Sequence, residues 1–243
     1  MSSLRESAIN IIVPILAARG IPVTLGAIGT LFGNRVDPAN YLSWSDCRQI
    51  VAAGGQVIAH GPLASPASNL IAAFSTNADR VADMNRSRDL IAANGCATPN
   101  FDKAYTWPQG QFQSATEDMT LLDAVRSEGY TVGRSASGSA FAVNEFSAAS
   151  KYQRLALPII GHTYAGAGEA ANITAINTQI GSIGAARGDG ILMFHIGLAV
   201  GAGSNALGIY VNNLIQIADA LVAERTAGRL QFGVLGDLAE PSD

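Results

Sequence analysis

The sequence contains few charged residues and no run of basic ones. Only 14% of its 243 residues are charged, whereas an average globular chain has about 25%. Lysine and arginine together number 15 and are scattered along the chain, and the formal net charge is −4. A protein that binds a nucleic-acid backbone carries a clustered basic surface. We therefore expect no nucleic acid among the partners.

Cysteine and long hydrophobic runs are also scarce. Cys47 and Cys96 form no CxxC pattern, so we interpret both as ordinary residues of helical segments, with a disulfide between them as the open alternative. No segment reaches the ~18 uninterrupted apolar residues of a membrane span. Arg5 and Glu6 interrupt the apolar start, and no cleavage pattern follows, so we expect no signal peptide. The expectation is a soluble protein, with its compartment left open.

Apolar residues are abundant, at 48% of the chain, and there are 26 glycines. Short β-rich runs alternate with helical patterns, which is typical of βα units with a parallel sheet. Without a polar linker between units, we predict one α/β domain over residues 1–243: a distorted or open (β/α) barrel of about seven strands. The expected strands are 22–28, 56–60, 103–107, 130–134, 152–159, 190–195 and 230–235. The expected helices are 4–19, one capped by Ser43 and ended by Gly54, one or two within 68–94, one from 116, and others near 170–187 and 205–226.

Polar and aromatic residues stand where several expected strands end. His60, Trp107, Arg134 and His195 close four strands, and His162 stands near the end of another. In a parallel α/β barrel, the ligand site lies at the carboxyl ends of the strands. The three histidines are therefore candidates for one site, and the alternative is that each is a core histidine bonded to a backbone carbonyl.

Aromatic side chains near the same strand ends could bind a sugar. Tyr105, Trp107, Phe112 and Tyr164 are placed there by the predicted strands and loops. Flat apolar sugar faces pair with aromatic rings, so these residues are candidates for a stacking platform. The alternative is ordinary packing of aromatic rings at the barrel mouth.

Several segments resemble, in order, the motifs of one enzyme family. They are "VPILAARGIPVTLGAIG", "LSWSDCRQIVAAGGQVIAHG", "YTWPQGQF", "AVRSEGYTVGRS" and "DGILMFHIG". Their order and spacing resemble the NodB-type polysaccharide deacetylases (carbohydrate esterase family 4), over nearly the whole chain. The resemblance implies a deacetylase-like barrel that removes N- or O-acetyl groups from a glycan with Zn²⁺ or another divalent cation.

The same resemblance implies roles for individual residues. His60 would be a metal ligand, and His162 is a further candidate ligand. His195 would be the general acid, next to Leu192 in the acetyl pocket. The loop after the third strand would contribute the backbone N–H of Gln109 to the oxyanion, with its shape set by Pro108 and Gly110.

The chain also departs from the family pattern. The Asp-Asp motif that supplies the base and a metal ligand is absent, together with its strand, so we regard the chain as an incomplete or divergent member. The second metal-binding histidine is replaced by Ala64, beside Ser65, and the arginine of the third motif by Thr106. Asp37 and Glu169 are carboxylates in loops that could fold over the site. Since zinc sites use three or four protein ligands, the expected cofactor is a divalent cation if the chain is active, or none.

Two main hypotheses follow. The first is a carbohydrate deacetylase-like hydrolase acting on an acetylated glycan. The second is a catalytically inactive barrel of the same kind that serves as a glycan-binding or structural module, for example in a cell-surface or phage-tail assembly. An unrelated barrel enzyme with His195 as general base is a weaker third. Without a first strand, strand 22–28 and the last strand each expose an edge, so self-association at this gap is expected.

Overall fold

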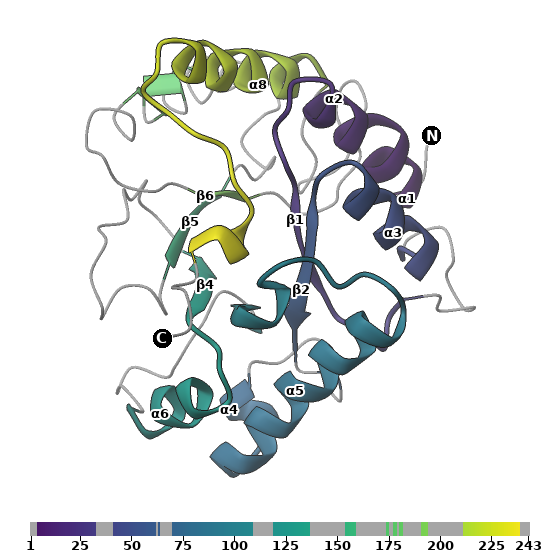
Figure 1. Ribbon diagram of the computed structural model, residues 1–243, viewed down its shortest axis with the longest axis vertical. Coiled ribbons are helices and arrows are strands. Elements are labelled where there is room, and N and C mark those ends of the chain that lie inside the picture. The colour runs from purple at the N-terminus through teal and green to yellow at the C-terminus, as the bar shows by residue number, and fades with distance from the viewer. Residues whose placement is uncertain are drawn as a thin grey trace.

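The computed structural model describes residues 4–32, 41–61, 63, 70–108, 119–136, 154–158, 174, 177–178, 180–181, 191–193 and 211–238. Within them, six parallel strands form one sheet whose order in space is their order in the chain. Such an order is that of a (β/α) barrel wall, because a doubly wound sheet reverses its order at a switch point. The α/β architecture is therefore compatible with a partial barrel (Figure 1). The strands are β1 (Thr24–Ala27), β2 (Gln56–His60), β3 (Ala104–Thr106), β4 (Val132–Ala136), β5 (Arg154–Pro158) and β6 (Ile191–Met193).

The strand predicted at residues 230–235 is wrong. Residues 230–234 belong to no strand, and a 3-10 helix, η6 (Leu235–Leu238), follows them. The physical reason is a local turn, in which the Asp237 carboxylate accepts the Val234 N–H at 2.8 Å and the Asp237 N–H donates to the Val234 carbonyl at 2.9 Å. Such an Asp turn competes with a ladder for the same backbone groups. Among the described residues the sheet has six strands, with β1 and β6 at its two ends.

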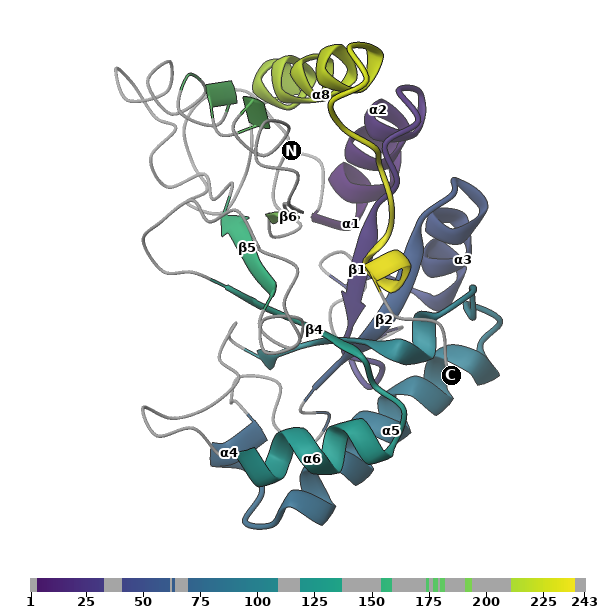
Figure 2. The ribbon, with the colours of Figure 1, turned by 60° about the vertical axis from the view of Figure 1, so that its left-hand side comes forward.

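This 3-10 helix closes the amino-terminal end of the sheet. The Leu235 N–H donates to Thr24 Oγ1 at 3.0 Å, and the Gly236 N–H donates to Gln56 Oε1 at 2.8 Å. Thr24 and Gln56 are the first residues of β1 and β2. The carboxyl ends of the strands therefore lie at the opposite end of the sheet from η6 (Figure 2).

Helices follow most of the strands, as the alternating pattern predicted. The first helical run contains a π-helical stretch that ends at Ile12, two residues before Pro14, whose missing N–H interrupts the usual hydrogen bonding. The helical elements are α1 (Leu4–Ser7), η1 (Ala8–Ile12), α2 (Val13–Ala17), α3 (Trp44–Ala52), α4 (Leu70–Ala73), α5 (Asn77–Ala93), η2 (Phe101–Lys103), α6 (Met119–Ser127) and α8 (Val211–Thr226). No helix of these described residues is long and apolar enough to cross a membrane.

The predicted cap of α3 is confirmed. The Ser43 hydroxyl accepts the Asp46 N–H, and the Asp46 carboxylate accepts the Ser43 N–H at 2.6 Å, which completes a capping box. Asp46 also accepts two hydrogen bonds from the Arg5 guanidinium, at 2.6 and 3.0 Å. The start of α3 is thereby tied to α1 (Figure 1).

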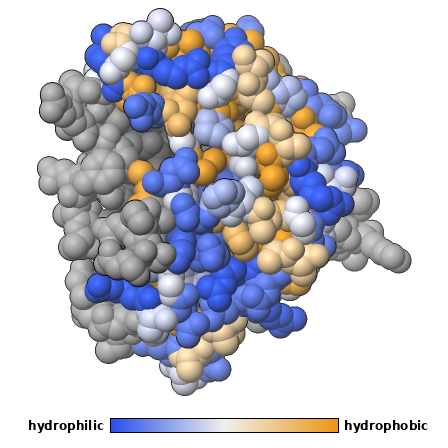
Figure 3. Space-filling view, in the orientation of Figure 1, coloured by the Kyte–Doolittle hydropathy of each residue, from blue (hydrophilic) through white to orange (hydrophobic). Residues whose placement is uncertain are grey.

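The sheet buries both of its faces. On the helix side, residues of β1, β2 and β3 pack against α3, α5 and α6, and this cluster includes Tyr105, Trp107 and both cysteines. On the other side, which we call the inner face, Ile58, Ala104 and Val132 pack against Leu235 of η6. On the face of the molecule that Figure 3 shows, both hydrophilic and hydrophobic residues reach the surface, as is usual for a folded protein.

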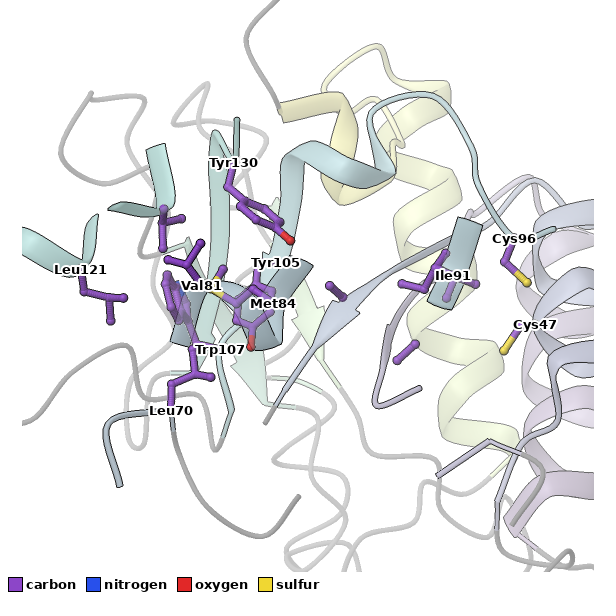
Figure 4. Packing of buried hydrophobic residues seen from close by; sticks show 14 residues of the cluster. Cys47, Leu70, Val81, Met84, Ile91, Cys96, Tyr105, Trp107, Leu121 and Tyr130 are labelled. Atoms are coloured by element: carbon purple, nitrogen blue, oxygen red, sulfur yellow. The ribbon is translucent and has the colours of Figure 1, made fainter. Parts of the chain in front are cut away.

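The two cysteines are free and buried. Cys47 lies in α3, as predicted, and Cys96 lies just beyond the end of α5 (Figure 4). Burial raises the pKa of both thiols, because a thiolate is poorly solvated in an apolar core. The disulfide alternative is not formed in this structure.

Candidate functional site

The carboxyl ends of the central strands bring three polar side chains together on the inner face. His60 ends β2 and is in register with Thr106, the last residue of β3. Thr106 is in turn in register with Arg134 of β4. Since side chains two residues apart in a strand share a face, these residues lie on the same side as Ile58, Ala104 and Val132. His60, Thr106 and Arg134, which we call the inner-face triad, therefore form a row across three neighbouring strands.

The curvature of the sheet brings β1 into contact with this row. A Cβ placed on Gly26 of β1 would lie 2.9 Å from Thr106 Oγ1 and 3.0 Å from His60 Cδ2. Thr106 is two strands away from Gly26, and its side chain reaches across β2 only because the inner face is concave. Gly26 lacks a side chain where those two side chains converge, so His60 and Thr106 occupy the hollow of the sheet.

The orientation of the His60 ring is set by its own loop. His60 Nδ1 lies 2.9 Å from the carbonyl oxygen of Gly61. A carbonyl only accepts, so Nδ1 carries the hydrogen, and the neutral ring has its lone pair on Nε2. Histidines that bind metals commonly have this second hydrogen bond to a carbonyl. The tautomer is thus suited to a ligand or a proton acceptor at Nε2.

The backbone around His60 is fixed by side chains of α5. The Leu63 N–H donates to both oxygens of the Asp83 carboxylate, at 3.1 and 3.0 Å. One turn further along α5, the Ser87 hydroxyl lies 3.2 Å from the Ala27 carbonyl oxygen and 3.5 Å from that of His60. The ends of β1 and β2 and the following loop are therefore held from the helix side of the sheet.

Gly61 is required by this support. A Cβ at Gly61 would lie 2.6 Å from Asp83 Oδ2 and 2.7 Å from the Tyr105 hydroxyl. Burial raises the pKa of the Asp83 carboxyl, and burial, together with the Asp83 charge, raises the pKa of Tyr105 well above its usual range. The loop after β2 is thus packed directly onto a buried polar cluster.

Arg134 brings a positive charge to the inner face. Burial lowers the pKa of its guanidinium to about 10, because a charged group loses solvation there. This value still leaves the guanidinium positively charged at neutral pH. The sequence placed Arg134 at a strand end without giving it a role, and its position beside Thr106 depends on the register between β3 and β4.

The sugar-stacking platform is not formed by Tyr105 and Trp107 in this structure. Their side chains are 0% and 1% exposed and belong to the core on the helix side. The Tyr105 ring meets Trp107 and Tyr130 edge-on, with ring centroids 5.1 and 6.0 Å apart. The three residues lie in one group in Figure 4. Alternation along β3 places Thr106 inside and both aromatics outside. The alternative interpretation, ordinary core packing, fits this arrangement.

Several other predicted site residues lie outside the described part of the chain. Pro108 is described and buried, two residues after the end of β3, and Leu192 occupies the middle of β6. The predicted residues outside the described ranges are Ala64, Ser65, Gln109, Gly110, Phe112, His162, Tyr164 and His195, with the loop carboxylates Asp37 and Glu169.

The described residues do not fit a divalent metal ion by themselves. Among them, no three histidine, cysteine, aspartate or glutamate side chains gather in one place. His60 supplies one imidazole, and its neighbours in the register are a hydroxyl, on Thr106, and a positive guanidinium, on Arg134. Zinc needs three or four protein ligands, and a nearby cation opposes a second one.

Comparisons with known proteins add little to this geometry. No family model and no curated protein matches the chain. Among solved structures, the chain is similar to IcaB from Ammonifex degensii, with a TM-score of 0.39 and 19% sequence identity. The likeness covers 50% of this chain and 51% of that one, so the chain spans about half the length of the structure it matches. Neither a shared family nor a shared activity follows from it, and the family suggested by the sequence motifs stays a prediction.

Proposed function

We propose that the chain is a carbohydrate deacetylase-like barrel that binds an acetylated glycan at the carboxyl ends of β1 to β4. The observation that supports this is the inner-face triad, three polar residues in register on one face of a parallel sheet, two of which, His60 and Thr106, converge over Gly26. In barrels of this kind, ligands bind at that end of the strands. The order of the sequence motifs supplies the glycan as the expected ligand.

Hydrolysis of an acetyl group would place further demands on the site. Attack of water on the carbonyl requires a base for the water proton, donors for the oxyanion and an acid for the leaving group. Of the residues described, His60 has the tautomer for accepting a proton at Nε2. By resemblance, the backbone N–H of Gln109 would face the oxyanion and His195 would be the acid. Metal-dependent catalysis would need ligands beyond His60, and His162 is the candidate.

The alternative is a catalytically inactive barrel that serves as a glycan-binding or structural module. Two observations favour it. Thr106 stands where the resembling family has an arginine, and its hydroxyl side chain packs over Gly26 on the inner face. Arg134 adds a positive charge at the same end of the sheet, two strands from His60. A binding module needs neither a base nor a metal ion.

Binding and turnover are tested together. The probes are an N-acetylglucosamine oligomer and an O-acetylated xylan oligomer, with affinity measured by calorimetry and acetate release measured on the same samples. His60→Ala alters the inner face, and Ser127→Ala, at the exposed end of α6, is the matched control.

We expect glycan binding that weakens in His60→Ala and persists in the control. Acetate release that needs His60 would establish the hydrolase, and binding without release would establish the module. Absence of both binding and release with the unaltered chain would refute the proposed function.

A further inference from the structure

Two thiols from distant parts of the sequence meet on the helix side of the sheet. Cys47 lies in α3 and Cys96 lies just beyond the end of α5, and both side chains are 0% exposed. The two side chains are hydrogen-bonded to each other, and Figure 4 shows them next to each other at one end of the core. Two sulfur atoms at hydrogen-bonding distance need only a small local movement to reach the geometry of a disulfide.

The segment that carries Cys96 is held on both sides of Cys47. Cys96 Sγ lies 3.9 Å from the carbonyl oxygen of Trp44, which stands one turn before Cys47 in α3. On the other side of Cys47, the Arg48 guanidinium donates to the Asn94 carbonyl at 2.9 Å. The turn after α5 is therefore seated on α3 by contacts of its backbone, so the packing of the two segments, and not one side-chain rotamer, brings the thiols together.

Cys96 is the thiol that a small molecule can reach first. It is a buried residue in an exposed turn, because Gly95 and Ala97 on either side of it are both exposed. Gly95 has a φ of +70°, a conformation that commonly ends a helix. Surface turns open locally at a lower free-energy cost than the core beneath them. Opening of this turn brings the Cys96 sulfur to solvent, whereas Cys47 stays within α3.

Opening of the turn also changes the reactivity of the thiols. In the closed structure, burial raises the pKa of both, although the nearby Arg48 guanidinium favours their thiolates. Since the thiolate is the nucleophile, buried thiols are inert. Water that enters with opening removes the penalty of burial and leaves the positive charge of Arg48 nearby. Reaction with an oxidant is therefore coupled to opening.

We propose that Cys47 and Cys96 are a site of reversible covalent modification, at which a small disulfide, glutathione disulfide, joins them in a disulfide that the native fold accommodates. The Cys96 thiolate attacks one sulfur of the oxidant, whose S–S bond breaks and releases one glutathione thiolate. The Cys47 thiolate then attacks the Cys96 sulfur of the mixed disulfide and releases the second glutathione. Two protein thiols are oxidised, one disulfide is reduced to two glutathione thiols, and the two protons pass from protein to glutathione.

This bond would act on the part of the chain that carries the inner face. The loop closed between Cys47 and Cys96 contains β2, which ends in His60, and α5, from which Asp83 accepts the Leu63 N–H. A cross-link over a loop of this length restricts the unfolded chain and so favours the folded one. The oxidised protein should therefore be more stable than the reduced one. The inference goes beyond the proposed function and does not depend on glycan binding.

The test treats the folded, unaltered chain with glutathione disulfide, alkylates the remaining thiols with iodoacetamide and maps the peptides by mass spectrometry. Cys47→Ser and Cys96→Ser are the single variants, and Cys47→Ser/Cys96→Ser is the matched control for effects of the oxidant elsewhere. Circular dichroism checks that each variant is folded. Urea unfolding compares the oxidised chain with the same sample after reduction by dithiothreitol.

We expect the unaltered chain to yield one cross-linked peptide pair, with Cys47 joined to Cys96, and to retain no glutathione. Cys47→Ser should instead keep glutathione on Cys96, because no second thiol displaces it. The cross-link should raise the urea midpoint by about 1 to 2 M, and dithiothreitol should reverse the rise, with no change in the double variant.

Three results would overturn the inference. The first is full alkylation of both cysteines, stable glutathione adducts or disulfides between chains in place of the cross-link. The second is a cross-link that forms only in urea, because the native packing would then not bring the thiols together. The third is an unchanged or lower urea midpoint of the cross-linked chain, which would mean that the native fold does not accommodate the bond. Each of them would leave the proposed function standing.

Discussion

The concave inner face is the feature on which the proposed function depends, and Gly26→Ala tests it directly. The added Cβ would lie 2.9 Å from Thr106 Oγ1, 3.0 Å from His60 Cδ2 and 3.1 Å from Thr106 Cβ. All three distances are below the about 3.5–4.0 Å at which nonbonded atoms pack best. Threonine is β-branched, so its side chain rotates away only with difficulty. The His60 ring is also held, through its bond to the Gly61 carbonyl.

We therefore expect Gly26→Ala to lower the free energy of unfolding by about 1 to 3 kcal/mol, the usual cost of overpacking a filled site. Urea unfolding followed by circular dichroism measures this change. Thr106→Ala removes the hydroxyl oxygen of the shortest contact, so in that background the added methyl group should cost less. The difference between the two costs, expected to exceed about 0.5 kcal/mol, is the coupling between residues that touch.

The matched control is Gly181→Ala. Gly181 is helical, and a Cβ there would meet nothing within 4 Å. Alanine in a helix is favoured over glycine by about 1 kcal/mol, so this variant should be as stable as the parent or more so. If Gly26→Ala were equally harmless, or cost the same with and without Thr106→Ala, the inner faces of β1 and β3 would not meet as described. The site built on them would then be wrong.

Four further outcomes follow from the same structure. Trp107→Ala should lower the free energy of unfolding, measured with urea, by about 3 to 5 kcal/mol, the cost of truncating a core aromatic, and leave the glycan affinity measured by calorimetry unchanged. Weaker glycan binding with unchanged stability would instead support a role for Trp107 in stacking on a sugar. The raised pKa of Asp83 contributes stability below about pH 3.9 that is lost as pH rises through the folded-state pKa. Asp83→Asn keeps an acceptor for the Leu63 N–H. Between pH 4 and 7 the free energy of unfolding of this variant should therefore fall less than that of the unaltered chain, and an equal fall would contradict the raised pKa of Asp83. Zinc titrated by calorimetry should show no micromolar binding that His60→Ala abolishes; such binding would mean that ligands lie outside the described residues. Light scattering at high concentration should show self-association through β1 and β6, the two end strands of the sheet among the described residues, and a monodisperse monomer would count against it.

Local signals in the sequence predicted the elements that depend on local interactions. The capping box of Ser43 and Asp46 is formed by residues three positions apart, so the start of α3 could be placed from the sequence. The alternation of strands and helices likewise predicted a parallel sheet. The strand expected at 230–235 failed because an Asp turn at Asp237 uses the backbone groups of Val234. Five of the six residues in that segment are not turn formers, so its apolar pattern was misleading.

The sequence does not show which residues of β3 lie on the inner face of the sheet and which lie on the helix side. Both faces of the sheet are buried, so apolar residues do not alternate with polar ones along "AYTW". A shift of one residue exchanges the inner and outer faces, and this is why Tyr105 and Trp107 were expected to contact a ligand, whereas Thr106 was noted only as the replacement of the arginine in the third motif. The position of Arg134 depends on pairing between strands that are separated by α6 in the chain. Such non-local register has no signature in a single sequence.

In the segment "GGQVIAHG", two glycines are required by the packing of the fold, whereas the histidine is not. A Cβ on Gly55 would lie 2.6 Å from the Val23 carbonyl oxygen, and one on Gly61 would lie 2.6 Å from Asp83 Oδ2. Both glycines are therefore required by close packing, whatever the chemistry of the site, and a motif match at those positions is informative about the fold alone. His60 is different, because its ring bonds the carbonyl of the next residue and lies in the hollow of the sheet beside Gly26 and Thr106. Packing against the helices does not require an imidazole there, so His60 is the residue of this segment that tests for function should address.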